Sequence, residues 1–85
     1  MTRRREPGKY ERFRRLLLEA RTDVAQIDQH EAAKRMGVHQ TFISKCERGV
    51  RRVDFVEWLR FCDAYKVPVH FFLDPFGVGL PVRRG

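Results

Sequence analysis

One stretch of the sequence, residues 40–48, carries short polar and cationic side chains whose chemistry suits contact with DNA bases. They are Gln40, Thr41, Ser44 and Lys45. Residues three and four apart share a face of a helix, so a helix here would present them together. A glutamine can form two hydrogen bonds with adenine, a lysine can donate to guanine, and a threonine methyl group can contact that of thymine. A solvated helix face has the same composition, so the neighbouring elements must decide between the two interpretations.

The elements around this face support base contact. The apolar side of the predicted helix 40–48 consists of Phe42, Ile43 and Cys46. A second predicted helix, residues 29–36, precedes it, and its inner face consists of Ala32, Ala33 and Met36. Gly37 stands between the two helices, where a left-handed backbone ends a helix without steric cost. Two helices joined by a short turn with a glycine form a helix-turn-helix motif, whose second helix enters the DNA major groove.

The chain before this motif is predicted to form a basic arm and one long helix. Residues 1–8 are basic and end in Pro-Gly, which predicts a flexible arm that either contacts DNA or is merely solvated. Residues 9–24 follow as an amphipathic helix, because apolar residues recur every three or four positions. Its apolar stripe consists of Tyr10, Phe13, Leu17, Ala20 and Val24. Its arginines lie off this stripe and are expected to face solvent; they are Arg12, Arg14, Arg15 and Arg21.

The chain after the motif is rich in apolar residues. Residues 53–66 are predicted as a fourth helix that opens with a D-x-x-E capping pattern, and Pro68 begins a short fifth helix or turn. An apolar tail, residues 75–85, ends the sequence. Since 85 residues leave little interior for so many apolar side chains, we expect a homodimer. The predicted dimer residues are Trp58, Phe61, Phe71, Phe72, Phe76 and Leu80. The alternative is that the tail folds back over its own core.

The charge of the chain favours an acidic partner. A net charge of +7 and a pI near 10.3 point to nucleic acid, although charge can also serve solubility alone. Residues 1–15 contain seven Arg or Lys against two Glu, and residues 41–52 contain four against one. The positive charge is therefore concentrated where a DNA backbone would lie. Arg48, Arg51 and Arg52 are accordingly candidates for phosphate contacts.

Other classes of protein find little support. No apolar run approaches the roughly 18 to 20 residues of a membrane helix, and no secretory signal is recognised, so we expect a cytoplasmic protein. Cys46 and Cys62 are too few for a disulfide framework and are expected to be buried free thiols. The sequence shows no metal-ligand spacing, nucleophile–base pair or phosphate loop. We therefore expect no enzyme, no cofactor and no metal site.

Residues 29–49 also carry a family pattern, which is Gln29, Ala33, Gly37, Ile43 and Glu47 followed by Arg48-Gly49. Through this pattern the chain resembles the phage-repressor (Cro and repressor type, or xenobiotic-response-element) family of helix-turn-helix proteins, over about residues 9–74. The resemblance implies a compact, all-α, five-helix repressor-like domain that binds operator DNA as a dimer.

The resemblance also implies roles for individual residues. The residues that would contact base edges are Gln40, Thr41 and Lys45, with Ser44 nearby. Gln29 would contact a phosphate and buttress Gln40, while Glu47 would be a structural charge. His39 stands where the family usually has a serine or threonine N-cap. Its imidazole is therefore either a weaker cap or a further contact to the DNA backbone.

Together these features predict a sequence-specific transcriptional regulator, a repressor that binds a palindromic double-stranded DNA operator as a homodimer. The alternative is the antitoxin of a toxin–antitoxin pair, which would bind a toxin as well as its own operator. Only about 11 residues follow Asp74, which leaves little room for a separate toxin-binding segment. An RNA-binding interpretation lacks exposed aromatic residues at the spacing that stacks single-stranded bases.

Overall fold

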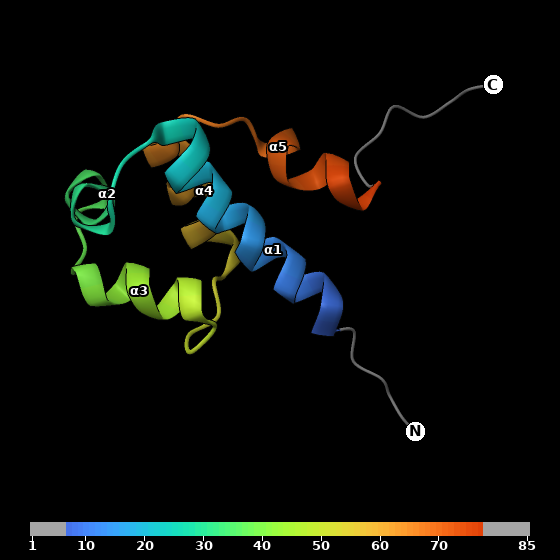
Figure 1. Ribbon diagram of the computed structural model, residues 1–85, viewed down its shortest axis with the longest axis horizontal. Helices are drawn as coiled ribbons and strands as arrows, with labels where there is room; N and C mark the ends of the chain where they lie inside the picture. The colour runs from blue at the N-terminus through green and yellow to red at the C-terminus, as the bar shows by residue number, and fades with distance from the viewer. Residues whose placement is uncertain (1–6, 78–85) are drawn as a thin grey trace.

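The computed structural model describes residues 7–77, and every regular element in this range is helical (Figure 1). The elements are α1 (Pro7–Glu19), the π-helix η1 (Ala20–Ala25), α2 (Gln29–Met36), α3 (Gln40–Arg48), α4 (Phe55–Tyr65), α5 (Val69–Leu73) and the 3-10 turn η2 (Asp74–Phe76). α3 packs against α2 and α1, and α4 packs against α2. The predicted compact, all-α fold with five helices is confirmed. No helix in the described range is long and apolar enough to cross a membrane.

The first helix begins earlier than predicted, at Pro7 rather than at residue 9. Proline is tolerated in the first turn of a helix, because the N–H that it lacks would have no partner there. Pro7 and Gly8 therefore belong to α1 and not to the predicted arm. The rest of that arm, residues 1–6, lies outside the described range.

The π-helix η1 changes which side chains are buried after α1. A π-turn closes its hydrogen bonds over five residues instead of four, so the side chains beyond Ala20 fall behind the α-helical stripe. Val24, which was predicted to be apolar core, is 49% exposed, whereas Arg21, which was predicted to face solvent, is only 9% exposed. The prediction for Val24 is wrong because it assumed an uninterrupted α-helix. The prediction for Arg21 is wrong because this residue stands four positions after the buried Leu17, on the same face of the helix.

The two helices of the predicted motif have the predicted bounds. Asp28 caps α2 by accepting the backbone N–H of Glu31 at 2.8 Å. α2 ends at Gly37, whose φ of 69° lies in the left-handed region that glycine enters without steric cost. The N–H of Gly37 bonds the carbonyl oxygens of Ala33 and Lys34, and this closes the turn into α3.

The core lies where α1, α2, α3 and α4 meet. Its largest fully buried side chains are Leu17, Ile43, Cys46, Phe61, Tyr65 and Phe72. Ala32 and Ala33 are 0% and 5% exposed, and their small side chains let α2 approach its neighbours closely. Both cysteines are buried free thiols, as predicted. Burial raises the pKa of the Cys62 thiol to about 11.

Two predicted dimer residues are core residues of the single chain. Phe61 and Phe72 are 0% and 1% exposed. The ring of Phe61 stacks on Phe42 with centroids 6.0 Å apart, and the ring of Phe72 lies 5.5 Å from that of Phe13. Their assignment to a dimer surface is therefore corrected. The cause is that α4 is apolar around most of its circumference, so periodicity could not identify its buried face.

The other predicted dimer residues lie closer to the surface or outside the described range. Trp58, Phe71 and Phe76 are half-buried and pack against the core, whereas Leu80 lies outside residues 7–77. The side of α4 that the single chain leaves open instead carries Phe55 and Val56, which are 66% and 63% exposed.

Candidate nucleic-acid interface

α3 presents the predicted base-contacting residues to solvent while its other side is anchored in the core. Ile43 and Cys46 are both 0% exposed. On the opposite side, Gln40, Thr41 and Lys45 are exposed. Because the buried side of α3 packs on α1 and α2, these three side chains project from a fixed support.

His39 at the start of α3 and Ser44 within it have environments of their own. His39 stands at the N-cap with extended backbone, and its side chain makes no capping hydrogen bond. Its imidazole is exposed beside Thr41 and Lys45, with which it lines one shallow pocket. Ser44 is half-buried, and its hydroxyl oxygen accepts a hydrogen bond from Nε of Arg48 at 3.1 Å. Ser44 therefore orients Arg48 as well as lying near the exposed face.

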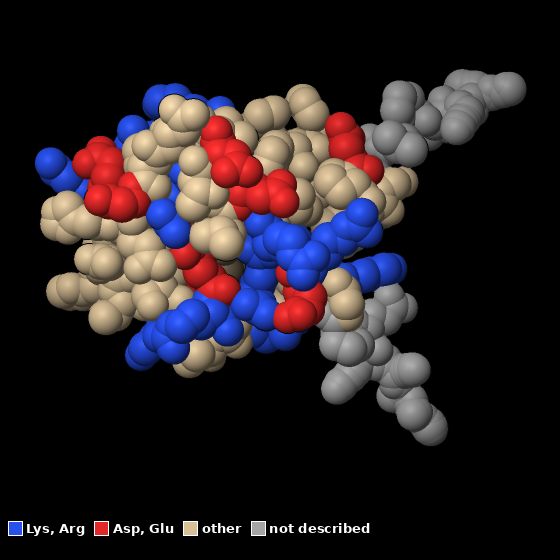
Figure 2. Space-filling model, in the orientation of Figure 1, with Lys and Arg blue, Asp and Glu red and all other residues tan. Residues whose placement is uncertain are grey.

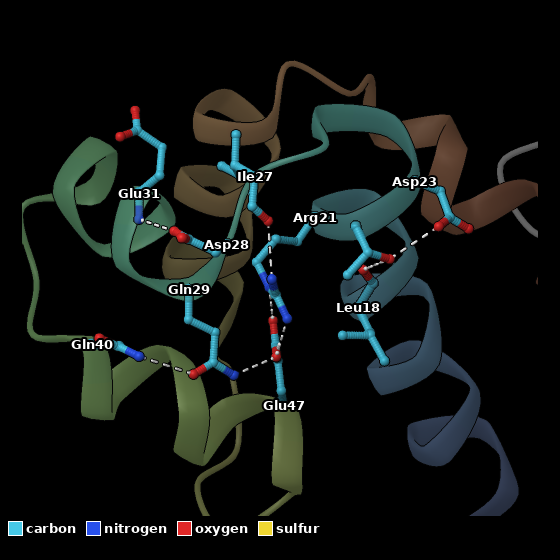
Figure 3. Close-up of polar contacts among 10 residues, drawn as sticks. Leu18, Arg21, Asp23, Ile27, Asp28, Gln29, Glu31, Gln40 and Glu47 are labelled. Carbon is cyan, nitrogen blue, oxygen red and sulfur yellow. Dashed lines mark hydrogen bonds and ion pairs between the residues drawn. The ribbon is translucent and has the colours of Figure 1, made fainter.

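A chain of hydrogen bonds connects η1 to the start of α3 (Figure 3). The carboxylate of Glu47 accepts from Nε of Arg21 at 2.6 Å and from Nη2 of Arg21 at 3.0 Å. Glu47 Oε1 also accepts from Nε2 of Gln29 at 2.9 Å. Gln29 Oε1 in turn accepts from Nε2 of Gln40 at 3.5 Å. Gln29 thus contacts Gln40 as the resemblance implied, and Glu47 is a structural charge.

The polarity of this chain determines which groups Gln40 leaves free. A carboxylate only accepts hydrogen bonds, so Glu47 turns the amino group of Gln29 toward itself and the Gln29 oxygen toward Gln40. Gln40 then uses one N–H on Gln29 and keeps one N–H and its oxygen for a ligand. One donor beside one acceptor complements the major-groove edge of adenine, whereas guanine presents two acceptors.

Arg21 is the site residue that was not predicted from the sequence. The side chains of Arg21 and Glu47 are only 11% and 7% exposed. Arg21 also donates Nη1 to the carbonyl oxygen of Ile27 at 3.0 Å, and its hydrogen bond to Glu47 raises the pKa of its guanidinium. The spacing of the sequence carried a signal for this burial, because Arg21 stands four positions after the buried Leu17 and so shares its face of the helix.

The three arginines at the end of α3 and in the following turn have different environments. Arg51 donates to both carboxylate oxygens of Glu57 at 2.7 Å and lies 4.7 Å over the Phe42 ring. Its charge is thus paired within the protein, which argues against its predicted contact with a phosphate. Arg52 instead lies 3.9 Å over the ring of Tyr10, and Arg48 is held through Nε by Ser44.

The surface charge follows these elements. On the face drawn in Figure 2, Lys and Arg side chains gather over α3 and the N-terminal half of α1. Asp and Glu gather over the end of α1 and over α2 on the same face. The positive charge on this face therefore lies over α3 and the neighbouring half of α1. Residues 7–77 contain no group of three or more His, Cys, Asp or Glu side chains that could hold a metal ion.

Comparisons with known proteins agree with this geometry. Residues 3–70 match a family described as a helix-turn-helix domain. A solved structure of an XRE-family like protein from Pseudomonas syringae pv. tomato is similar to this chain, with 36% sequence identity and a TM-score of 0.78. That similarity covers 89% of this chain and 92% of the other. No curated protein sequence matches the chain.

Proposed function

The chain belongs to the helix-turn-helix family of Cro and repressor type, whose members are DNA-binding transcription regulators, and we propose that it is a repressor that reads its operator with α3. The observation that carries this proposal is the exposed face of α3, held in place by a buried helix side and by the hydrogen-bond chain from Arg21 to Gln40.

In the proposed complex the start of α3 lies in the major groove. Gln40, Thr41 and Lys45 then face base edges, and Ser44 lies beside them. The polarity of the hydrogen-bond chain favours adenine opposite Gln40. Backbone contacts come from Gln29 and His39 near the start of α3 and from Arg48 and Arg52 at its other end. These contacts fix the register of the protein on the duplex without reading sequence.

We further propose that two copies bind one palindromic operator. A single α3 reaches only a few base pairs, so a pair of half-sites one helical turn apart, about 34 Å, supplies the remaining specificity. The support for association is the open side of α4, where Phe55 and Val56 are exposed. Repression follows sterically, because a dimer seated on its operator excludes other proteins from that DNA.

The experiment that tests this function is selection of bound duplexes from a random DNA library. The proposal expects an enriched site with two-fold symmetry, half-sites about 34 Å apart, and adenine at one position of each half-site. Enrichment of no sequence would contradict sequence-specific binding. Enrichment of a single asymmetric half-site would retain DNA recognition and overturn the dimeric arrangement.

A further inference from the structure

A groove lined by arginines lies between the first turns of α1 and the turn that follows α3. Its residues are Gly8, Tyr10, Glu11, Arg14, Arg48, Gly49 and Arg52, and its volume is about 530 Å³. It is separate from the exposed face at the start of α3, because it lies at the opposite, C-terminal end of that helix. Three of its residues are arginines, and its single carboxylate, that of Glu11, is paired with Arg14.

The wall of the groove is fixed by contacts between α1 and the end of α3. Arg14 donates Nη1 to the carbonyl oxygen of Glu47 at 2.8 Å and crosses directly over Gly49. A Cβ at Gly49 would come within 2.9 Å of Nε of Arg14. Arg14 is therefore bonded within the protein, to the Glu47 carbonyl oxygen and to Glu11, and its side chain forms one wall of the groove.

Tyr10 holds Arg52 at the mouth of the groove. The hydroxyl oxygen of Tyr10 accepts the backbone N–H of Val53 at 3.0 Å, which ties the ring to the start of α4. The guanidinium carbon of Arg52 lies 3.9 Å from the centroid of that ring, a cation–π contact that does not require the N–H groups of the guanidinium. Those groups are the donors with which arginine binds phosphate.

Arg51 and Arg52 are adjacent in the chain but have different partners. Arg51 is held by both oxygens of Glu57, so its positive charge is balanced inside the protein. Arg52 is stacked on an uncharged ring, and Arg48 is held by the uncharged hydroxyl of Ser44. Arg51 therefore fixes the turn, whereas the charge of Arg52 is left for an anion.

We propose that Tyr10 is a positioning residue, whose ring aims Arg52 at the DNA phosphate that Arg52 and Arg48 contact from this groove. The proposal rests on the proposed function, since it assumes that α3 lies in the major groove. A helix with its side chains is about 10–12 Å across, which fills the major groove of about 12 Å width, so both ends of α3 would lie beside a sugar–phosphate backbone. Gln29 at one end and the arginine-lined groove at the other would therefore each face a sugar–phosphate backbone.

The test measures the dependence of duplex affinity on salt for the full chain and four variants. Each phosphate contact contributes about 0.9 to the slope of log K against log salt concentration. Arg52→Gln is expected to lower the slope by about 0.9 on the selected site and on a random duplex alike. Tyr10→Leu is expected to lower it in the same direction. Tyr10→Phe keeps the ring and loses only the hydroxyl that accepts from Val53, so it should lower the slope by less than Tyr10→Leu. Arg51→Gln is the matched control and should leave the slope unchanged.

The outcomes separate this site from the proposed function. An unchanged slope in Arg52→Gln, or an equal loss in Arg51→Gln, would overturn the assignment of the groove. If Arg52→Gln lowers the slope but Tyr10→Leu does not, the positioning role of Tyr10 is overturned. If Tyr10→Leu fails to fold, the comparison between the two exposed arginines still decides the phosphate site. Binding of random duplex with the expected slope changes but no preference for any sequence would support the groove and refute sequence-specific regulation.

Discussion

Removal of the Glu47 carboxylate is the perturbation with the largest effect that can be worked out from the structure. Glu47→Ala deletes an acceptor that receives two hydrogen bonds from Arg21 and one from Gln29. It leaves the guanidinium of Arg21, whose side chain is 11% exposed, with no carboxylate beside it. Breaking a buried ion pair in this way costs about 3–5 kcal/mol. For an 85-residue chain the total free energy of unfolding is about 4–13 kcal/mol, so the loss is a large fraction of it.

A double variant separates stability from recognition. Replacing a buried ion pair by apolar residues of similar volume is often neutral or stabilising. Arg21→Met with Glu47→Leu is therefore expected to regain most of the stability that Glu47→Ala loses. It still removes the acceptor that orients Gln29, so Gln40 is no longer fixed. We expect this variant to be folded and to bind random duplex normally, with weaker discrimination between adenine and guanine at the position opposite Gln40.

The assays are urea unfolding followed by circular dichroism, and duplex affinity measured on matched sites. The control is Glu31→Ala, which removes an exposed pair with Arg35 and should cost no more than about 0.5 kcal/mol. A loss of less than about 1 kcal/mol in Glu47→Ala would refute the conclusion that the ion pair between Arg21 and Glu47 stabilises the fold. Undiminished base discrimination in the double variant would refute the orienting role of the hydrogen-bond chain.

Three further predictions follow from other parts of the chain. Gly49→Ala and Gly37→Ala both place a side chain at a positive φ, of 81° and 69°, and each should destabilise the fold by about 1–2 kcal/mol. Gly49→Ala should cost more, because its Cβ also displaces the side chain of Arg14. Equal losses of unfolding free energy in chemical unfolding would contradict this difference. The hydrogen bond from Arg51 lowers the pKa of Glu57 in the folded protein. The ionised Glu57 therefore stabilises the fold above its ordinary pKa of 4.5, and this stabilisation is lost as the pH falls through the lower folded value. Glu57→Gln should flatten the acid side of the curve of unfolding free energy against pH, and an unchanged acid side would count against the pair. Burial raises the pKa of Cys62 to about 11, so at pH 8 its thiol should react with a disulfide reagent only after unfolding, and rapid reaction of the native protein would show that the site is open.

The helix-turn-helix could be predicted from the sequence because its determinants are local. Asp28 and Gly37 carry the chemistry of a helix cap and a left-handed turn, and both perform those roles in the structure. The spacing of apolar residues in 40–48 left only one side of α3 for the core. For these two helices, propensity, capping and periodicity all favour the same structure, so their bounds could be predicted.

The remaining features depend on tertiary structure or on backbone irregularity. The π-helix that begins at Ala20 has no signal in the apolar spacing, yet it turns Val24 out of the core. α4 is apolar on several sides, so only packing against its neighbours selects Phe61 for the core and leaves Phe55 outside. Likewise, no local pattern distinguishes Arg51 from Arg52. Their roles diverge because Glu57 reaches one of them and Tyr10 lies under the other.

Base recognition by the start of α3 can be tested with the single variant Gln40→Ala. The affinities of this variant and of the unchanged chain are measured on the selected operator and on a random duplex at one salt concentration. We expect a loss of about 1–3 kcal/mol on the operator and almost none on the random duplex. An equal loss on both duplexes, or no loss on either, would contradict base recognition by α3.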